Sequence, residues 1–279
     1  MDFTNKTAVV SGAASGMGLL FSKNFASLGG NVVMADINTS DLNRFADEIN
    51  SSGKGRAIGI YNDVRNYSDV KNVCDIAYNH FGSIDIVANF AGGTAVRVQK
   101  VDFSKYPEFP DIPIEVYDWG IDVNLKGPFY FAHAACKYMR KQKGGLIINI
   151  GSITGMEGDG RGVDYPTAKS GIMFGLTKSL AQFGSKYGIR CVCISPGPVL
   201  TRPEMANMKT LLNRAADPQE IIDLILFVAS EKGQFINGEN IMIDGGRNAM
   251  GRGWKVRMGS GSNLLLITTY YLLLLITYY

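Results

Sequence analysis

The fold class of this chain is indicated by the segment Lys6-Thr-Ala-Val-Val-Ser11-Gly12-Ala-Ala-Ser-Gly-Met-Gly18. Its first six residues, which are rich in β-branched side chains, predict a buried strand. A glycine-rich turn follows directly, and apolar residues at helical spacing then continue as far as Gly29-Gly30. A strand, a glycine-rich turn and a helix in this order form the context of a dinucleotide-binding fingerprint. We therefore expect the chain to begin with the first unit of an α/β nucleotide-binding fold.

The glycines of this turn are suited to hold a phosphate group. Gly12, Gly16 and Gly18, with Ser15 and Met17 among them, let the backbone turn tightly and approach a pyrophosphate. That group would lie at the helix N-terminus, where amide donors and the helix dipole favour negative charge. The spacing is GxxxGxG rather than GxGxxG, so a strand-to-helix turn that merely uses glycine is the alternative.

A second predicted strand, residues 31–36, ends on Asp36, eighteen positions after Gly18. A carboxylate at this place accepts hydrogen bonds from the adenosine ribose hydroxyls and repels a 2′-phosphate. Neither Ile37 nor Asn38, which follow it, is an Arg or a Lys, and the glycine-rich turn carries no basic residue. We therefore expect NAD rather than NADP as the cofactor, with Asp36 and Ile37 beside it.

A Tyr and a Lys four residues apart, in Tyr165-Pro-Thr-Ala-Lys169, lie thirteen residues after Ser152. If this segment is helical, both side chains lie on one face, one turn apart. A phenol is a poor acid or base at neutral pH, and a nearby ammonium lowers the pKa of the phenol by favouring the phenolate. The Ser152 hydroxyl is available to hydrogen-bond a substrate oxygen. The three residues predict an acid–base site for a carbonyl or an alcohol.

Strand-like and helical patterns alternate along the chain, which predicts a doubly wound α/β fold with a parallel sheet. The chain has 279 residues and is 46% hydrophobic, enough for one large domain, which we expect to span residues 1–258. Long helical patterns cover about 115–142 and about 164–186. The strand-like runs are residues 6–11, 31–36, 56–61, 84–89, 145–151, 189–195 and 240–244.

The composition bounds the partners of this protein. The net charge is +3, from 28 basic and 25 acidic residues that are dispersed along the chain, so no nucleic acid is expected. The cysteines lack CxxC or Cys/His ligand spacing, which predicts reduced thiols and no metal site. No secretory signal precedes the first strand, and a cytoplasmic protein is expected.

The C-terminal segment 259–279 differs from the rest of the chain. A Gly-Ser linker at 259–262 precedes two nearly identical apolar runs, 264–271 and 272–279, without charge, Pro or Gly. Such a run is an aggregation or strand-pairing hazard when it is exposed, and it is short for a membrane span. We interpret it as an engineered or artefactual extension; a membrane or self-association anchor and docking on the protein's own surface are the alternatives.

These motifs together resemble the short-chain dehydrogenase/reductase family of single-domain enzymes over roughly residues 3–246. Each motif is modest alone, but seven in the family's order are very specific. Two departures are Ser11 where Thr is usual, and Phe90 in place of a second Asn. The matching segments are the cofactor loop Ser11 to Gly18, the adenine-contacting pair Asp63-Val64, the turn Asn89-Phe90-Ala91-Gly92, Asn124 in Asn124-Leu-Lys-Gly127, Ser152 with Tyr165 and Lys169, the loop over the nicotinamide with Pro196, Gly197, Val199 and Thr201, and the last strand and its exit at 241–246.

The resemblance implies a Rossmann-like sheet of seven parallel strands in the order 3-2-1-4-5-6-7, with helices on both faces. It also implies an NAD(H)-dependent oxidoreductase that interconverts a secondary alcohol and a ketone. Tyr165 would be the general acid/base, Lys169 would lower the pKa of Tyr165 and bind the nicotinamide ribose, Ser152 would orient the substrate oxygen, and Asn124 would support a proton relay. In the family, the two long helices pack against their copies, so a homotetramer or homodimer is expected.

Two segments are expected to shape the substrate site. The segment 93–117 is long for this type of enzyme and carries several aromatic residues and prolines, while the lid beyond Thr201 is short. This combination favours an apolar substrate, such as a steroid-like, terpenoid or aromatic secondary alcohol, although small diols or sugars fit an open site. The alternative is that 93–117 only covers a sheet edge or a subunit contact.

The sequence leaves two alternatives to a soluble enzyme. A catalytically idle NAD-binding scaffold of the same fold would be expected to lack Tyr165 or Lys169, and both are present. A membrane-tethered reductase of the same chemistry would use the segment 259–279 as its anchor. Without such an anchor, no membrane association is expected.

Overall fold

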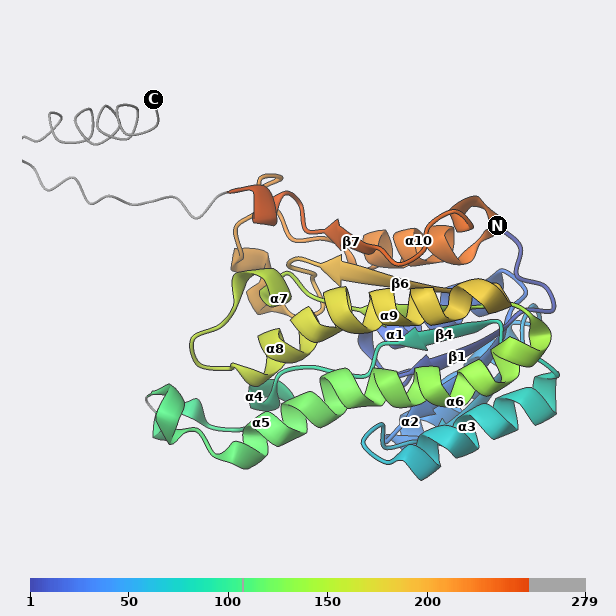
Figure 1. Ribbon diagram of the computed structural model, residues 1–279, viewed down its shortest axis with the longest axis horizontal. Coiled ribbons are helices and arrows are strands. Elements are labelled where there is room, and N and C mark those ends of the chain that lie inside the picture. The colour runs from blue at the N-terminus through green and yellow to red at the C-terminus, as the bar shows by residue number, and fades with distance from the viewer. Residues whose placement is uncertain (107, 251–279) are drawn as a thin grey trace, which may run out of the picture. The chain divides into compact units, whose positions relative to one another are not determined.

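Seven parallel strands form one sheet at the centre of the molecule (Figure 1). The computed structural model describes residues 1–106 and 108–250. The strand order is β3-β2-β1-β4-β5-β6-β7, which confirms the predicted order and the predicted doubly wound α/β class. The strands are β1 (Thr7–Ser11), β2 (Asn31–Asp36), β3 (Ala57–Tyr61), β4 (Ile86–Asn89), β5 (Gly145–Ile150), β6 (Ile189–Pro196) and β7 (Asn240–Ile243).

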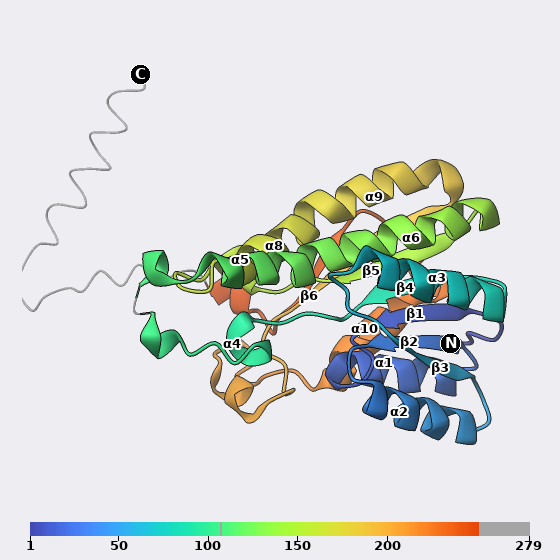
Figure 2. The same ribbon diagram turned by 90° about the horizontal axis from the view of Figure 1, so that it is seen from below.

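Helices cover both faces of the sheet, as Figure 2 shows. The helices of one face are α1 (Gly16–Ser27), α2 (Thr39–Ser51) and α10 (Pro218–Ala229); those of the other are α3 (Tyr67–Phe81), α6 (Gly127–Gln142) and α9 (Thr177–Gly184). Phe21 and Phe25 of α1 fill the first interface, and Phe131 and Met139 of α6 fill the second. Burying each such side chain contributes about 1.5–3 kcal/mol. Because both faces are covered, the strands are nearly continuous apolar runs.

The sheet changes its direction of winding at β1. Val9 of β1 pairs with Val33 of β2 on one side and with Val87 of β4 on the other. The connections from these neighbouring strands therefore lead away to opposite faces, which leaves a crevice beyond the carboxyl ends of β1 and β4. Ligands of open α/β sheets bind at such a topological switch point. The fold thus places the glycine-rich turn, which follows β1, beside the turn that follows β4.

The two long helices predicted at about 115–142 and about 164–186 are present, and each contains a π-helical turn. The first consists of α5 (Ile114–Ile121), the π-turn η3 (Asp122–Lys126) and α6; the second consists of α8 (Asp164–Ser170), the π-turn η4 (Gly171–Leu176) and α9. The short 3₁₀ turn η5 (Ser185–Tyr187) ends the second. Single π-turns inside α-helices are rare and frequently occur at functional sites. Here one contains Asn124, and the other begins directly after the turn that carries Lys169.

The segment 93–117 forms short helical pieces rather than a long loop. They are α4 (Ala95–Val98) and the 3₁₀ turns η1 (Phe103–Lys105) and η2 (Phe109–Asp111), after which α5 begins. The other short pieces are α7 (Thr154–Glu157), η6 (Pro203–Asn207), η7 (Glu231–Gly233) and η8 (Arg247–Met250). Met1–Ala249 is one compact unit. The expected domain end at 258 and the segment 259–279 lie outside the described residues.

The cysteines are buried thiols, as the sequence predicts: Cys74, Cys136, Cys191 and Cys193 are all free. Burial raises the pKa of the Cys74 thiol to about 12, so this thiol stays protonated at neutral pH. Within residues 1–106 and 108–250, no group of three His, Cys, Asp or Glu side chains is placed to hold a metal ion. In the same residues, no helix is long and apolar enough to cross a membrane.

Candidate active site

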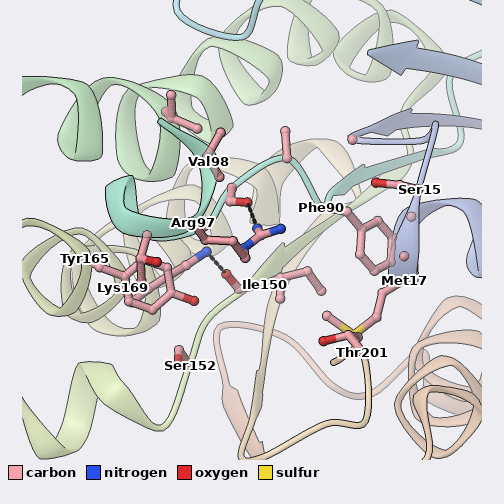
Figure 3. Close-up of a pocket in the computed structure, with 18 of the residues that line it drawn as sticks. Ser15, Met17, Phe90, Arg97, Val98, Ile150, Ser152, Tyr165, Lys169 and Thr201 are labelled. Carbon is pink, nitrogen blue, oxygen red and sulfur yellow. Dashed lines mark hydrogen bonds between the residues drawn. The ribbon is translucent and has the colours of Figure 1, made fainter. Parts of the chain in front are cut away.

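A cavity of about 720 Å³ lies beyond the carboxyl ends of the strands, at the switch point of the sheet. Its walls come from segments far apart in the chain, including the turn after β1, the end of β2, the turn after β4 and the loop after β6. Figure 3 shows Tyr165, Lys169 and Ser152 on one side of this cavity, with Ser15, Met17 and Thr201 on the other. The structure therefore brings the two groups of predicted site residues into one cavity.

The glycine-rich turn has the geometry of an anion-binding helix start. Gly16 has a φ of +54°, and a Cβ added to it would have no atom within 4 Å, so the turn leaves open space there. A Cβ on Gly18 would lie 2.2 Å from the Gly12 carbonyl oxygen, which requires glycine. The Ser15 side chain does not cap α1, and no acidic residue stands in its first turn. Within residues 1–106 and 108–250, the first amide groups of α1 therefore have no side-chain cap and are suited to a pyrophosphate.

Asp36 lies at the end of β2 on the wall of the same cavity. Its Oδ2 accepts a hydrogen bond from the Ala14 amide at 3.0 Å, and its Oδ1 accepts one from the Asn38 amide at 3.0 Å. These bonds fix the carboxylate against the glycine-rich turn and leave acceptor capacity for ligand hydroxyls. Ile37 lines the cavity beside it and is 61% exposed.

Asp63 and Val64, the pair that we expect to contact adenine, line the cavity beyond β3. Arg65 is the basic side chain of this region, and its Nη2 is 2.6 Å from Asp63 Oδ2. The hydrogen bond from Arg65 holds the pKa of the Asp63 carboxyl below its usual value. The Arg65 charge is thereby compensated within the protein.

Tyr165 and Lys169 lie on one face of α8 and both line the cavity, as their spacing predicts. The Lys169 Nζ lies 5.5 Å from the centroid of the Tyr165 ring. Lys169 is only 4% exposed, and its Nζ donates a hydrogen bond to the Ile150 carbonyl at 2.7 Å (Figure 3). An ammonium has further N–H donors, so this one can hold a second partner while its charge acts on the phenol.

Ser152 follows β5 and lines the cavity near the two helical residues. Its Oγ accepts a hydrogen bond from the Thr154 amide at 3.1 Å, which fixes the side chain at the start of α7. An oxygen that already accepts in this way keeps its O–H free to donate. Ser152 is therefore placed to donate a hydrogen bond to an oxygen in the cavity.

Asn124 lies behind the cavity wall rather than on it. It is fully buried; its Oδ1 accepts from the Gly93 amide at 2.9 Å, and its Nδ2 donates to the carbonyls of Gly93 at 3.0 Å and Gly120 at 2.9 Å. A Cβ built on Gly92 would lie 2.6 Å from Asn124 Oδ1 and 3.5 Å from Lys169 Nζ. Asn124 thus fixes the turn after β4 against η3, close to the ammonium of Lys169.

Only some of the residues predicted to contact the cofactor in the turn after β4 line the cavity. Ala91 and Gly92 line the cavity, but Asn89 does not. Asn89 is buried, and its Nδ2 donates to Asn149 Oδ1 at 2.9 Å, so its side chain joins β4 to β5. Asn89 is the last residue of β4, and its side chain has its partner on the neighbouring strand, so its assignment to the cofactor stays a prediction.

The loop after β6 lies where it was predicted: Pro196, Gly197, Val199 and Thr201 all line the cavity. The segment 93–117 was expected to shape the substrate site, but its aromatic residues Tyr106 and Phe109 do not line the cavity. Thr94, Arg97 and Val98, near the start of that segment, line the cavity instead. Lining residues that no motif indicated also include Asn62, Trp119, Arg202 and Met205.

Asn62 precedes the predicted pair Asp63-Val64 and could have been noticed as a buried polar residue at a strand end. It is 1% exposed, and neither polar atom of its side chain has a hydrogen-bond partner in the described part of the chain. A buried amide without partners is costly and is usually satisfied by a ligand or water. It adds a polar group to the end of the cavity where Asp36 lies.

Comparisons with known proteins agree with this geometry. A family model described as short chain dehydrogenase matches residues 6–211. A 7alpha-hydroxysteroid dehydrogenase from Bacteroides fragilis is 30% identical over 253 residues, which cover 87% of this chain and 94% of that protein. A trans-4-hydroxycyclohexanecarboxylate dehydrogenase from Sinomonas cyclohexanicum is 37% identical over 251 residues, which cover 86% of this chain and 92% of that protein.

A solved structure also matches this chain in fold. The crystal structure of a 3-oxoacyl-[acyl-carrier protein] reductase with bound NAD from Brucella melitensis matches with a TM-score of 0.78 at 28% identity, and it covers 87% of this chain and 91% of that one. Members of the family use nicotinamide cofactors, and the relatives named here are oxidoreductases. The strand order, the cavity at the switch point and these matches together establish that the chain belongs to the short-chain dehydrogenase family.

Proposed function

We propose that this protein is an NAD(H)-dependent oxidoreductase that interconverts a secondary alcohol and a ketone. The observation that carries the proposal is the single cavity that Tyr165, Lys169 and Ser152 share with the glycine-rich turn and Asp36. A nucleotide held at the turn would extend along this cavity toward the phenol. When it is bound, the nicotinamide supplies or accepts the hydride.

The side chains of this site supply orientation and proton transfer. Ser152 donates a hydrogen bond to the substrate oxygen and holds it near the phenol. Tyr165 gives its proton to that oxygen during reduction, or removes the alcohol proton during oxidation. Lys169 stabilises the phenolate form by its charge and offers its free N–H donors to the nicotinamide ribose.

Asn124 has a positioning role in this mechanism. Its side-chain amide holds both backbone groups of Gly93, and its Oδ1 and the Lys169 Nζ both lie close to Gly92. A proton relay from Lys169 to solvent would use the acceptor capacity that remains on Asn124 Oδ1. Loss of this side chain would release the turn after β4 as well as the relay.

Asp36 supports a preference for NAD over NADP. Its carboxylate is fixed by two backbone amides, and the basic side chain of this region, Arg65, is paired with Asp63. A 2′-phosphate beside Asp36 would therefore meet a held negative charge, and the nearby charge of Arg65 is already compensated by Asp63. The side-chain amide of Asn62 offers a further contact to the adenosine.

Cyclic secondary alcohols are the substrate class that we favour. The relatives include a hydroxysteroid dehydrogenase and a hydroxycyclohexanecarboxylate dehydrogenase, whose names both specify a hydroxyl on a ring. The substrate end of the cavity offers apolar side chains for a ring, including Val98, Trp119 and Met205. A catalytically idle scaffold is disfavoured, because Tyr165 and Lys169 both face the cavity.

The test is a screen of ketones and secondary alcohols in which NADH absorbance is followed with purified protein. Turnover of at least one cyclic member, with NADH oxidised in step with the carbonyl reduced, supports the proposal. Binding of NADH without turnover across linear, cyclic and aromatic members would instead favour the idle scaffold.

The assembly and the extent of the enzyme are part of the same proposal. We infer a cytoplasmic homotetramer or homodimer built on a catalytic domain of residues 1–258. Phe129, Phe174 and Phe183, which lie along the two long helices, are 41–45% exposed and suit a subunit contact. Light scattering after gel filtration measures the number of subunits, and fractionation of protein with and without residues 259–279 distinguishes a membrane-tethered reductase.

A further inference from the structure

Two guanidinium groups, those of Arg97 and Arg202, line the cavity. Among the residues that the structure describes, no Asp or Glu oxygen lies within 4.0 Å of either group. Arg97 Nη2 donates to the Gly92 carbonyl at 2.9 Å, and Arg202 Nη2 lies 3.6 Å from the sulfur of Met205. Each guanidinium therefore keeps most of its N–H donors unused.

These cations lie at the catalytic end of the cavity. The Gly92 carbonyl binds Arg97, and a Cβ built on the same glycine would lie 3.5 Å from Lys169 Nζ, so Gly92 separates the two charges. Figure 3 draws Arg97 reaching to this turn. The Arg97 and Arg202 residues are both exposed, so an anion can reach them from solvent. Partial burial of the Arg97 guanidinium lowers the pKa of Arg97, and the positive charge of Arg202 lowers it further. The two like charges therefore repel each other, and an anion bound at this place would offset that repulsion.

The remaining charges at this end do not neutralise the pair. Lys169 adds a further positive charge. Asp159 lines the cavity, but its Oδ1 accepts the Arg161 amide at 2.9 Å. The described charged groups at this end are thus the Asp159 carboxylate and the cations of Arg97, Arg202 and Lys169, so the net charge there is positive.

We propose that Arg97 and Arg202 bind a carboxylate on the substrate, so that the enzyme prefers cyclic hydroxy acids and oxo acids to neutral alcohols and ketones. This inference rests on the proposed function and specifies its substrate. A planar guanidinium matches a carboxylate with parallel hydrogen bonds, which gives both affinity and orientation. Trp119, Val98 and Met205 supply the apolar wall for the ring that carries the acid.

The cofactor pyrophosphate is the other anion that the guanidiniums could contact. The structure favours the substrate, because the first turn of α1 already provides a phosphate site and Arg97 lies instead beside Gly92, near Lys169. The two sources differ in what a substitution changes. A guanidinium that serves the pyrophosphate affects NADH binding and all substrates alike, whereas one that serves a substrate carboxylate affects acids selectively.

The experiment compares kcat/KM for trans-4-hydroxycyclohexanecarboxylate with that for its carboxamide, which has nearly the same shape without the charge. We expect the parent enzyme to favour the acid by roughly 10- to 100-fold, the range that charge-assisted hydrogen bonds provide. In Arg97→Gln and Arg202→Gln, this acid-to-amide ratio should fall roughly 10-fold or more, while the dissociation constant of NADH stays within about 3-fold of the parent. Arg97→Lys should restore part of the ratio. Arg56→Gln is the matched control, because Arg56 is exposed and does not line the cavity.

Two results would overturn the inference: equal kcat/KM for acid and amide in the parent, or a ratio that neither substitution changes. Weaker NADH binding with an unchanged ratio would assign the guanidiniums to the pyrophosphate and is a refutation as well. A second arm is independent of turnover. Calorimetry on the enzyme–NADH complex should show tighter binding of cyclohexanecarboxylate than of cyclohexanecarboxamide, with the difference lost in Arg97→Gln. If the acid binds selectively and nothing turns over, the proposed function fails and the carboxylate site stands; if binding does not discriminate, the site is wrong.

Discussion

Replacing Lys169 with Met separates the two tasks that we assign to this side chain. Met has a similar length and fits the buried channel beside α8, where Lys169 is only 4% exposed. The substitution removes the charge 5.5 Å from the Tyr165 ring centroid and the hydrogen bond to the Ile150 carbonyl at 2.7 Å. The cavity keeps its shape while the phenolate loses its counter-charge.

The size of the effect follows from that geometry. With the 5.5 Å from Lys169 Nζ to the Tyr165 ring centroid taken as the separation, two unit charges interact with about 3 kcal/mol at an effective dielectric constant of about 20. Each 1.4 kcal/mol corresponds to about a factor of ten in rate, so kcat should fall on the order of 10²-fold. Without the Lys169 donor, the Ile150 carbonyl loses its hydrogen bond, which should lower the free energy of unfolding by about 1–3 kcal/mol. Loss of the ribose contact should weaken NADH binding roughly 10-fold.

Steady-state kinetics with a substrate from the screen, together with fluorescence titration of NADH, measure both effects. The matched control is Lys178→Met, which removes an exposed lysine that does not line the cavity, and it should leave both quantities unchanged. A Lys169→Met enzyme with kcat and NADH affinity within about 3-fold of the parent would refute the reasoning, because the charge would then have no part in the chemistry.

Three further predictions concern the cofactor, stability and the C-terminus. Asp36→Asn removes the charge but keeps an acceptor, so the ratio of kcat/KM for NADH to that for NADPH should fall roughly 10-fold or more; equal values for both cofactors in the parent would contradict the role of Asp36. Burial raises the pKa of Asp164 above its usual 3.8, so the protonated acid stabilises the fold and that stability is lost as the pH rises through this pKa. Asp164→Asn should therefore raise Tm at neutral pH, with a gain that shrinks as the pH falls toward 4, and calorimetry showing a gain independent of pH would disprove it. Removing residues 259–279 should leave kcat unchanged, because the lining residues of the cavity within 1–106 and 108–250 all lie at or before Met208; loss of turnover in the 1–258 protein would contradict this.

Much of the fold was predictable because its signals are local. The strand at Thr7–Ser11, the turn with Gly16 and the strand that ends on Asp36 follow from side-chain patterns over a few residues. The strand order needed the handedness of parallel crossovers together with the family resemblance. Tyr165 and Lys169 were predictable as neighbours because i, i+4 spacing on a helix fixes their relation without any tertiary contact.

The rest of the site depends on tertiary contacts that no local pattern encodes. The π-turn at Asp122–Lys126 shifts the hydrogen bonds of a helix whose apolar spacing looks continuous. Arg97 belongs to a short helix in a segment without periodicity, and its place beside Gly92 arises only when α4 folds back over the turn after β4. Asn89 shows another limit of local patterns, because the motif does not indicate that its side chain hydrogen-bonds Asn149 within the sheet.

The most direct test of the central claim is Tyr165→Phe, measured for turnover and for NADH binding in the same preparation. The substitution removes one oxygen and keeps the ring, so the cavity wall and the cofactor site remain. We expect kcat to fall by roughly 10²–10⁴-fold or more, while the dissociation constant of NADH stays within about 2-fold of the parent. Turnover within a few-fold of the parent would remove Tyr165 from proton transfer and would contradict the proposed chemistry.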